Sequence, residues 1–309
     1  MDFKHISVLL DESVNAVVTD KKGIYVDCTL GGAGHFMAIG SKLDAEGIII
    51  GIDQDSAAIE NARRVTVNLK CKVYLVQDNF SNLAKVLKSL NIENVTGIIF
   101  DLGVSSYQLD TPERGFSYMH DAPLDMRMSV ENSRNAGYIV NNYSQEQLSK
   151  IIYQYGEERW AKRIAEFIIK ARNTKKIETT YDLVNIIKQA IPKGARQDGP
   201  HPAKRTFQAL RIEVNNELGI LENTFKVAVD ALRPGGKIAV ITFHSLEDRI
   251  TKQVFAELQK GCICPKNFPV CMCNNSAKLK KGLSLKPSKE EIEENHRSRS
   301  ARLRVAEKL

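Results

Sequence analysis

Residues 25–35 decide the fold, and they read Tyr25-Val26-Asp27-Cys28-Thr29-Leu30-Gly31-Gly32-Ala33-Gly34-His35. An apolar run ends here in an acid, and a glycine-rich turn follows at once. A helix-like segment then leads to a second apolar run, residues 48–52, which ends in Asp53. A strand, a turn poor in side chains, a helix and a strand that ends in an acid form the nucleotide-binding half of an α/β sheet. The glycines let the backbone approach a ligand closely, and Asp53 stands where a carboxylate accepts hydrogen bonds from ribose hydroxyls.

The alternation of strand and helix continues beyond this unit. Strands are expected at residues 24–28, 47–53, 72–77 and 97–102, with helical segments between them, which predicts a parallel sheet. The pattern resumes late in the chain, with a long helical region at residues 203–232 that ends at Arg233-Pro234-Gly235-Gly236. Strands at residues 237–243 and 301–306 follow, and the polar segment 278–299 is expected to be a mobile loop.

Residues 108 to about 200 carry no strand pattern. A capping box at Ser144-Gln145-Glu146-Gln147 opens a helix, and apolar residues from Trp160 to Ala171 recur at helical spacing. We therefore predict a discontinuous sheet domain, residues 1–107 and 203–309. It is interrupted by an inserted all-helical domain, residues 108–202, that recognises the substrate.

Bulk composition limits the class of protein. The chain has 309 residues, 43% of them hydrophobic, and a net charge of +7, which indicates either a polyanionic partner such as nucleic acid or an ordinary basic enzyme. No apolar run approaches the ~20 residues of a membrane helix, and no secretion signal opens the chain. We expect a cytosolic protein whose cysteines are mostly reduced.

A glycine-rich turn followed by an acid also describes an NAD site, so the ligand needs further evidence. The third glycine of the dinucleotide pattern is absent, because Met37 stands in its place. S-adenosylmethionine is favoured by polar groups and an aromatic ring after the third strand (Asp78-Asn79-Phe80) and by Asp101-Leu102-Gly103 after the fourth. Alternatively, Phe80 belongs to the core and Asp101 caps a helix.

Several long motifs are similar to those of the bacterial small-subunit rRNA cytosine-N(4) methyltransferase family. In chain order they are His5, Val8-Leu9-Leu10 and Glu12; Asp101-Leu102-Gly103-Val104-Ser105-Ser106; Arg114-Gly115-Phe116-Ser117; Pro123-Leu124-Asp125-Met126-Arg127-Met128; Tyr155-Gly156-Glu157-Glu158-Arg159; His201-Pro202-Ala203-Lys204-Arg205-Thr206-Phe207-Gln208-Ala209-Leu210-Arg211-Ile212; and Phe243-His244-Ser245-Leu246-Glu247-Asp248-Arg249. The resemblance runs from His5 to the carboxyl terminus.

This resemblance implies a class I S-adenosylmethionine-dependent methyltransferase, with a Rossmann-like sheet and a helical insertion. It implies methylation of the exocyclic amino group, N(4), of a specific cytosine in the decoding centre of 16S rRNA, with that rRNA in the small subunit as the partner. Neither a membrane nor an obligate protein partner is expected. The implied cofactor contacts are Ala33, Gly34, His35, Asp53, Phe80, Asp101 and Gln108.

The residues themselves narrow the acceptor atom. Methylation of carbon 5 of a pyrimidine usually needs a cysteine nucleophile, and residues 101–107 contain none, so nitrogen or oxygen is the better target. The amino group of cytosine is a poor nucleophile, and a hydrogen-bond acceptor beside it takes up developing positive charge. We assign this role to Asp101, or to a backbone carbonyl of the same turn, with Ser105 and Ser106 shaping the pocket. The Asn/Asp-Pro-Pro-Tyr/Phe motif of many amino-methyltransferases is absent here.

Candidates for substrate contact follow from charge and ring chemistry. Lys204 and Arg205 stand in the first turn of a helix, where the dipole disfavours cations; they contact an RNA phosphate or pair with Glu247 or Asp248. His244, at the end of the fifth strand, contacts RNA or a backbone carbonyl. Two further groups of side chains, one aromatic and one basic, each have two possible roles. Tyr107, Phe116 and Tyr118 stack on a flipped base or pack, and Arg297, Arg299, Arg302 and Arg304 form a basic strip or a solvated edge strand.

Two Cys-x-Cys pairs, Cys262 with Cys264 and Cys271 with Cys273, form a compact group. Four thiols in a reducing compartment suggest zinc or another soft metal in a structural role. The spacing is tighter than the usual Cys-x-x-Cys, so a redox-labile loop and plain thiols stay open, and no metal enters the predicted active site.

Two rival functions share parts of this pattern. An NAD-dependent oxidoreductase lacks its third glycine and a clear hydride-transfer set of residues. A non-catalytic RNA-binding or ribosome-assembly protein predicts a damaged pocket, yet Gly34, Asp53 and Asp101 are intact. We expect an rRNA methyltransferase that acts on an assembled particle, because a basic surface and an inserted domain suit recognition of folded RNA by shape.

Overall fold

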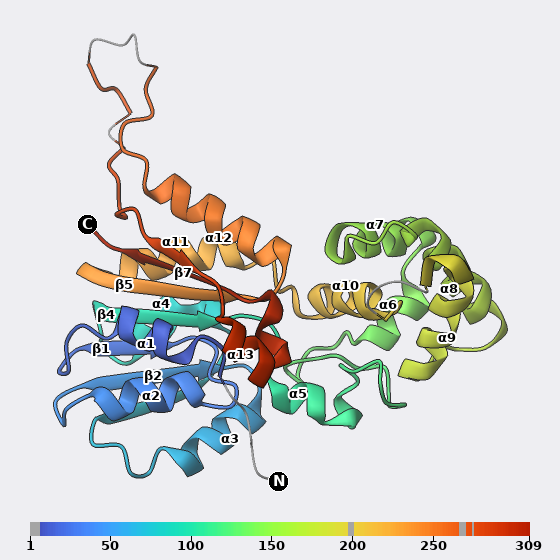
Figure 1. The fold of residues 1–309 in the computed structure, drawn as a ribbon, viewed down its shortest axis with the longest axis horizontal. Helices are drawn as coiled ribbons and strands as arrows, with labels where there is room; N and C mark the ends of the chain where they lie inside the picture. The colour runs from blue at the N-terminus through green and yellow to red at the C-terminus, as the bar shows by residue number, and fades with distance from the viewer. Residues whose placement is uncertain (1–6, 197–200, 266–269, 274) are drawn as a thin grey trace. The chain divides into compact units, whose positions relative to one another are not determined.

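The computed structural model describes residues 7–196, 201–265, 270–273 and 275–309 (Figure 1). His5 of the amino-terminal motif lies outside the described residues. The chain forms two compact units, Met1–Gly103 with Leu218–Leu309 (the sheet unit) and Val104–Glu217 (the helical unit). None of the helices in the described ranges is long and apolar enough to cross a membrane.

The sheet unit contains a seven-stranded sheet in the order β3-β2-β1-β4-β5-β7-β6. The first five strands in this order are mutually parallel, and β7 runs antiparallel to both β5 and β6. Their bounds are β1 (Ile24–Asp27), β2 (Ile48–Asp53), β3 (Lys72–Gln77), β4 (Val95–Asp101), β5 (Leu232–Thr242), β6 (Leu283–Leu285) and β7 (Arg302–Glu307). The predicted α/β sheet with a helical insertion is confirmed.

Apolar side chains cover both faces of this sheet, as parallel strands require. Alternate residues such as Val26 and Ile50 face one core, and Tyr25 and Ile49 face the other. The first core is completed by α4 (Leu83–Ser89), α11 (Leu221–Ala231) and α12 (Ser245–Leu258). The second is completed by α1 (Leu10–Val17), α2 (Gly34–Lys42) and α3 (Ser56–Val65).

The predicted helical region at residues 203–232 is helical in two parts, and two other expectations for the later part of the chain were wrong. The helical region 203–232 is two helices, because Asn216 adopts a left-handed conformation (φ 50°) after α10 (Lys204–Asn215). Residues 233–236 lie inside β5, where Gly235 has φ 77° and the ladder with β4 shifts register. Segment 278–299 contains β6 and α13 (Lys289–Glu294), and Glu291 accepts a hydrogen bond from Leu9 N at 2.7 Å.

The helical unit has its own apolar core. Its helices are α5 (Ser106–Asp110), α6 (Ala136–Asn142), α7 (Gln145–Gly156), α8 (Ala161–Thr174), α9 (Thr180–Ala190) and α10, with short 3-10 turns η2 (Pro112–Arg114) and η3 (Lys193–Arg196). Within the described part of this unit, the β-pairing is a single isolated bridge between Pro123 and Thr179.

Helix α10 belongs to the helical unit, whereas the sequence placed it in the sheet domain. Its residues Phe207, Leu210 and Val214 enter the helical core. Asn215 at its end accepts from Met128 N and donates to the carbonyl of Met126, both at 2.8 Å. The sequence could not show this packing, because a single amphipathic pattern does not identify which core a helix covers.

Candidate active site

Three carboxylates end three neighbouring strands of the sheet. Asp27 ends β1, Asp53 ends β2 and Asp101 ends β4, and β1 lies between the other two. The chain proceeds from β1 to β2 on one side and later returns to β4 on the other. Ligands of open α/β sheets bind at such a switch point, outside the carboxyl ends of the strands.

The glycine-rich turn is tied to two of these strand ends. Gly31 N donates to Asp53 Oδ2 at 2.8 Å, and Asp101 N donates to Thr29 Oγ1 at 2.5 Å. Gly31 has φ 45°, a left-handed conformation that glycine adopts at little cost. The turn is therefore held in place before any ligand arrives.

Helix α2 begins directly after this turn. Ala33, its N-terminal flanking residue, has φ 66° and provides no side-chain cap. A Cβ at Gly34 would lie 1.9 Å from Ser7 Oγ and 3.1 Å from Ser7 Cβ, so a larger residue at the first helical position would require the Ser7 side chain to move. The first N–H groups of a helix lack intrahelical acceptors, which makes this end a place for a polar ligand.

Burial raises the pKa of both carboxyl groups beside the turn. The pKa of Asp53 rises to about 6, although backbone N–H groups of Asp55 and Gly31 oppose the rise. The pKa of Asp27 rises to about 7, because burial and the charge of Asp53 outweigh the hydrogen bond from Thr29 N.

Asp101 is the most perturbed acid of the group. Burial, followed by the charges of Asp27 and Glu247, raises its pKa well above the ordinary value. Its Oδ1 atom is buried and accepts no hydrogen bond from the described residues. A buried polar atom without a partner is uncommon in a folded protein and indicates a missing ligand or a functional role.

His35 stands beside Asp101. Its Nδ1 lies 3.5 Å from Asp101 Oδ2, and its Nε2 lies 3.2 Å from the carbonyl oxygen of Val8. A neutral ring that donates from Nε2 to this carbonyl leaves Nδ1 as an acceptor, which suits a protonated Asp101.

His244 and Glu247 form a capping box at the start of α12. Glu247 Oε2 accepts from Phe243 N at 2.8 Å and from His244 N at 3.2 Å, while His244 Nε2 lies 3.1 Å from Oε1. The Glu247 side chain is buried, and the His244 side chain is partly buried. The group beside the His244 ring is thus a carboxylate, whereas the predicted alternative to RNA was a backbone carbonyl.

Phe80 lies at the end of β3, in the sheet unit. Its ring meets Phe100 edge-to-face at 5.7 Å between centroids, and it is only partly buried. One side of the Phe80 ring therefore packs in the core, and part of the ring stays accessible.

The remaining predicted contacts lie in the helical unit. Ser105 and Gln108 form a capping box, with Gln108 N donating to Ser105 Oγ at 3.2 Å and Ser105 N donating to Gln108 Oε1 at 3.1 Å. Ser106 is the first residue of α5, which this box begins. The structure thus gives Ser105 and Gln108 a local role in starting a helix.

Lys204 and Arg205 open α10 with exposed side chains. Arg205 Nη1 donates to the carbonyl of Glu157 at 3.0 Å. Asp248, one acid proposed to pair with these cations, instead accepts two hydrogen bonds from Arg304, at 2.7 and 3.1 Å.

Two aromatic candidates pack within the helical unit. Phe116 is buried in its core, and Tyr118 stacks on His201 with 4.6 Å between ring centroids. Tyr107 lies in α5 and is partly buried. These contacts favour packing over base stacking as the role of Phe116 and Tyr118.

The solvated edge strand proposed for the arginines near the carboxyl terminus was wrong. Strand β7, which carries Arg302 and Arg304, lies between β5 and β6, so it is an interior strand. Both arginines approach Asp248, which leaves Arg297 and Arg299 as the exposed members of the set.

Two buried acids of this site, Asp27 and Glu247, were not among the predicted site residues. Asp27 had a signal, because it ends the first strand directly before the glycine turn. Glu247 had only its motif, Phe243-His244-Ser245-Leu246-Glu247, and no local pattern places a helix residue beside the end of β4.

Comparisons with known proteins identify a family that matches nearly the whole chain. The model of a family described as the MraW methylase family matches residues 2–309. The ribosomal RNA small subunit methyltransferase H of Clostridioides difficile (strain 630) is 51% identical over 311 residues, covering 100% of both chains.

Solved structures resemble the chain more distantly. An rRNA methylase from Streptococcus thermophilus has a TM-score of 0.43 and 11% identity, covering 97% of this chain and 93% of its own. A structure from Streptococcus mutans in complex with SAH has a TM-score of 0.43 and 14% identity, covering 99% and 100%. The strand order of the sheet unit defines its fold without these two structures.

Proposed function

Because this chain belongs to the MraW methylase family, it is an S-adenosylmethionine-dependent methyltransferase of small-subunit rRNA, and we propose that the donor binds at the carboxyl ends of β1, β2 and β4. The acceptor is N(4) of a cytosine in the decoding centre of 16S rRNA, as the sequence resemblance implied.

One observation carries the placement of the donor: the cluster of Asp27, Asp101 and Glu247, in which Asp101 Oδ1 is buried and has no hydrogen-bond partner among the residues that the structure describes. Three acids so close together repel one another when ionised, and burial adds to the cost. A cationic ligand relieves both costs, and S-adenosylmethionine supplies a sulfonium cation with a transferable methyl group.

The other donor contacts follow from the same edge of the sheet. Gly34 begins α2, whose first turn offers backbone N–H groups to a polar ligand, and Asp53 stands at the β2 end, suited to ribose hydroxyls. Ala33 belongs to the turn directly before this helix, and its own N–H donates to the carbonyl of Leu30. Phe80 offers a partly accessible ring face suited to adenine. His35 positions Asp101.

Asp101 has a second role in this proposal. Once ionised beside a cation, its carboxylate accepts a hydrogen bond from the amino group of the target cytosine and stabilises positive charge on that nitrogen. Chain residues thereby orient the acceptor, and no covalent intermediate is required.

Two measurements test this function. Titration calorimetry of the purified chain is expected to show binding of S-adenosylmethionine and none of NAD. Mass mapping of rRNA nucleosides from a deletion strain is expected to show loss of one N(4)-methylated cytosine. An unchanged set of modified cytosines would refute the assignment.

We propose that the substrate is the assembled small subunit in the cytoplasm and that no protein partner is needed. The basic charge of the chain and its helical unit support recognition of folded RNA. Purified enzyme is expected to methylate purified subunits faster than a free 16S transcript. Equal rates on both, or a requirement for an added protein factor, would contradict this.

A further inference from the structure

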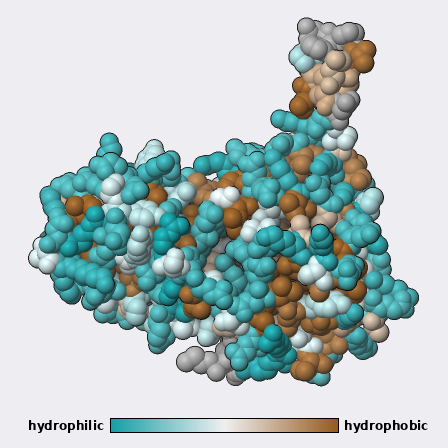
Figure 2. All heavy atoms as spheres, turned by 180° about the vertical axis from the view of Figure 1, so that it is seen from behind, coloured by the Kyte–Doolittle hydropathy of each residue, from teal (hydrophilic) through white to brown (hydrophobic). Residues whose placement is uncertain are grey.

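The loop between α12 and Leu279 carries four of the six cysteines of the chain and extends from the sheet unit (orange in Figure 1). Its base is closed by hydrogen bonds from Lys278 N and Leu279 N to the carbonyl of Leu258, at 2.8 and 3.1 Å. Beyond the base, large apolar side chains are exposed: Ile263 by 63%, Val270 by 68% and Met272 by 73%. Figure 2 shows apolar surface on this projection. The described part of the loop therefore has no apolar core to hold its shape.

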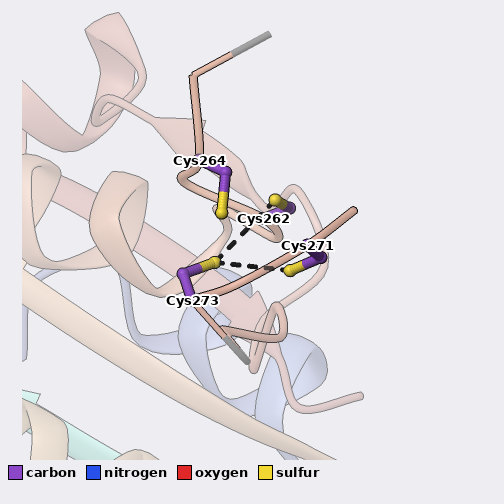
Figure 3. Close-up of side chains that lie close together, drawn as sticks. All are labelled: Cys262, Cys264, Cys271 and Cys273. Carbon is purple, nitrogen blue, oxygen red and sulfur yellow. Dashed lines mark hydrogen bonds between the residues drawn. The ribbon is translucent and has the colours of Figure 1, made fainter. Parts of the chain in front are cut away.

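The four thiols nevertheless converge. The sulfur atoms of Cys262, Cys264, Cys271 and Cys273 all lie within 4.8 Å of one another. Cys271 Sγ is 3.6 Å from Cys273 Sγ, which is 3.8 Å from Cys262 Sγ (Figure 3). The side chains come from two separate segments and point toward a common centre (Figure 3).

These spacings fit a tetrahedral metal site. Zinc–thiolate bonds of about 2.3 Å place tetrahedral sulfur ligands about 3.8 Å apart. A disulfide needs about 2.05 Å between sulfurs, so the observed arrangement contains none. Thiols are weak hydrogen-bonding groups, and mutual attraction alone gives four of them little reason to gather in an exposed loop.

Backbone N–H groups also point at the sulfurs. Ile263 N lies 3.3 Å from Cys273 Sγ, and Met272 N lies 3.3 Å from Cys264 Sγ. Such donors stabilise the thiolate form that a metal requires, and they fix the direction of each ligand. Asn275 Nδ2 further ties the two segments by donating to the carbonyls of Lys260 and Gly261, at 3.0 and 2.7 Å.

We propose that Cys262, Cys264, Cys271 and Cys273 bind one zinc ion as a four-thiolate site. Each thiol gives up its proton to solvent as its sulfur–zinc bond forms, and no oxidation occurs. Because thiolates fill all four positions, the ion has no open position for substrate, so the site is structural. The bound zinc ion stabilises this loop, whose described part has no apolar core to do so.

The first test measures metal content in the full chain, purified with reduced thiols and without chelator. Inductively coupled plasma mass spectrometry is expected to find one zinc per chain. Cys262→Ser and Cys273→Ser are expected to lose most of it. Cys71→Ser, which removes a buried thiol outside the cluster, is the matched control and is expected to keep it.

Cobalt substitution tests the geometry. Co²⁺ added to the zinc-free chain is expected to give the intense visible absorption of a tetrahedral thiolate site, and Zn²⁺ is expected to abolish it. Iron in place of zinc, disulfides between these cysteines in the purified protein, or no metal in the wild-type chain would each overturn the proposal.

A third measurement separates the metal from methyl transfer. Chelation or Cys273→Ser is expected to raise hydrogen exchange at described loop residues 260–265 and 270–278 while calorimetry still detects S-adenosylmethionine binding. Retained donor binding shows that the variant is folded. Unchanged exchange after metal removal would refute the stabilising role.

Discussion

At the scale of single residues, the site is an arrangement of buried acids. Asp101 has a buried oxygen with no hydrogen-bond partner in the described part of the chain, and burial, followed by the charges of Asp27 and Glu247, raises its pKa. The same environment that makes the free carboxylate costly makes it a strong partner for a cation and for an amino group that becomes positive.

Asp101→Asn keeps the shape of the side chain and removes its charge. We expect methyl transfer to fall by about 10²-fold or more, since an amide accepts less charge from the cytosine nitrogen. Single-turnover rates with saturating S-adenosylmethionine measure this effect. Full turnover of this variant with donor bound would show that a backbone carbonyl of the same turn, not the Asp101 side chain, accepts the hydrogen bond from the cytosine amino group.

Donor affinity is expected to depend on pH. Asp53 and Asp27 have pKa values of about 6 and about 7, so both ionise as the pH rises through this range. Ionised Asp27 attracts the sulfonium cation, and ionised Asp53 is the better acceptor for ribose hydroxyls. The dissociation constant for S-adenosylmethionine therefore falls as the pH rises from about 5 to 8, by up to about tenfold per pH unit for each fully linked proton.

S-adenosylhomocysteine is the matched control, because it lacks the sulfonium charge but keeps the ribose, adenine and amino acid groups. Calorimetry at several pH values is expected to give it a flatter profile. Parallel profiles for the two ligands would show that the acids do not act on the sulfonium.

At the scale of elements, the family motifs of the helical unit tie loops to helices. Asn215 at the end of α10 joins both Met126 and Met128, and Met126 itself has φ 63°. Gly156 at the end of α7 allows close packing, since a Cβ there would lie 2.6 Å from the carbonyl oxygen of Arg205. Packing within the helical unit therefore explains much of the residue choice in these motifs.

Asn215→Ala removes hydrogen bonds to two backbone groups of the 126–128 loop. We expect a loss of about 1–3 kcal/mol in the free energy of unfolding, because partly buried backbone groups lose their partner. Denaturant unfolding by circular dichroism measures it. Asn142→Ala, which removes one exposed hydrogen bond to Tyr138, is the control and should change stability by less than about 0.5 kcal/mol.

At the scale of the whole molecule, a net charge of +7 suits a polyanionic substrate. Lys204 and Arg205 stand out within this charge, because the dipole of α10 disfavours cations at its first turn. We propose that a phosphate of the RNA substrate offsets the cost of these cations.

Lys204→Ala is expected to weaken binding of the small subunit by about 1 kcal/mol, or roughly fivefold in KM, and to reduce the salt dependence of KM. Binding of S-adenosylmethionine should not change. Lys170→Ala on α8 removes an exposed lysine that pairs with Glu166, and it serves as the control. An equal effect of both substitutions would point to general charge rather than to a phosphate contact at Lys204.

The sequence by itself determined the parallel strands, the glycine turn, the acids that end β1, β2 and β4, and the presence of a helical insertion. These features are local: strand periodicity, turn chemistry and the last residue of a strand depend on neighbours in the chain. The family could be identified because its motifs are contiguous in sequence.

Only the tertiary structure decided which core α10 covers, that β7 is an interior strand, and that Glu247 approaches Asp101. It also decided that two Cys-x-Cys pairs, seven positions apart at their nearest members, bring four sulfurs together. Each of these depends on contacts between segments that are separate in the chain. Such contacts are set by packing and by the closure of loops, and no local pattern of side chains contains them.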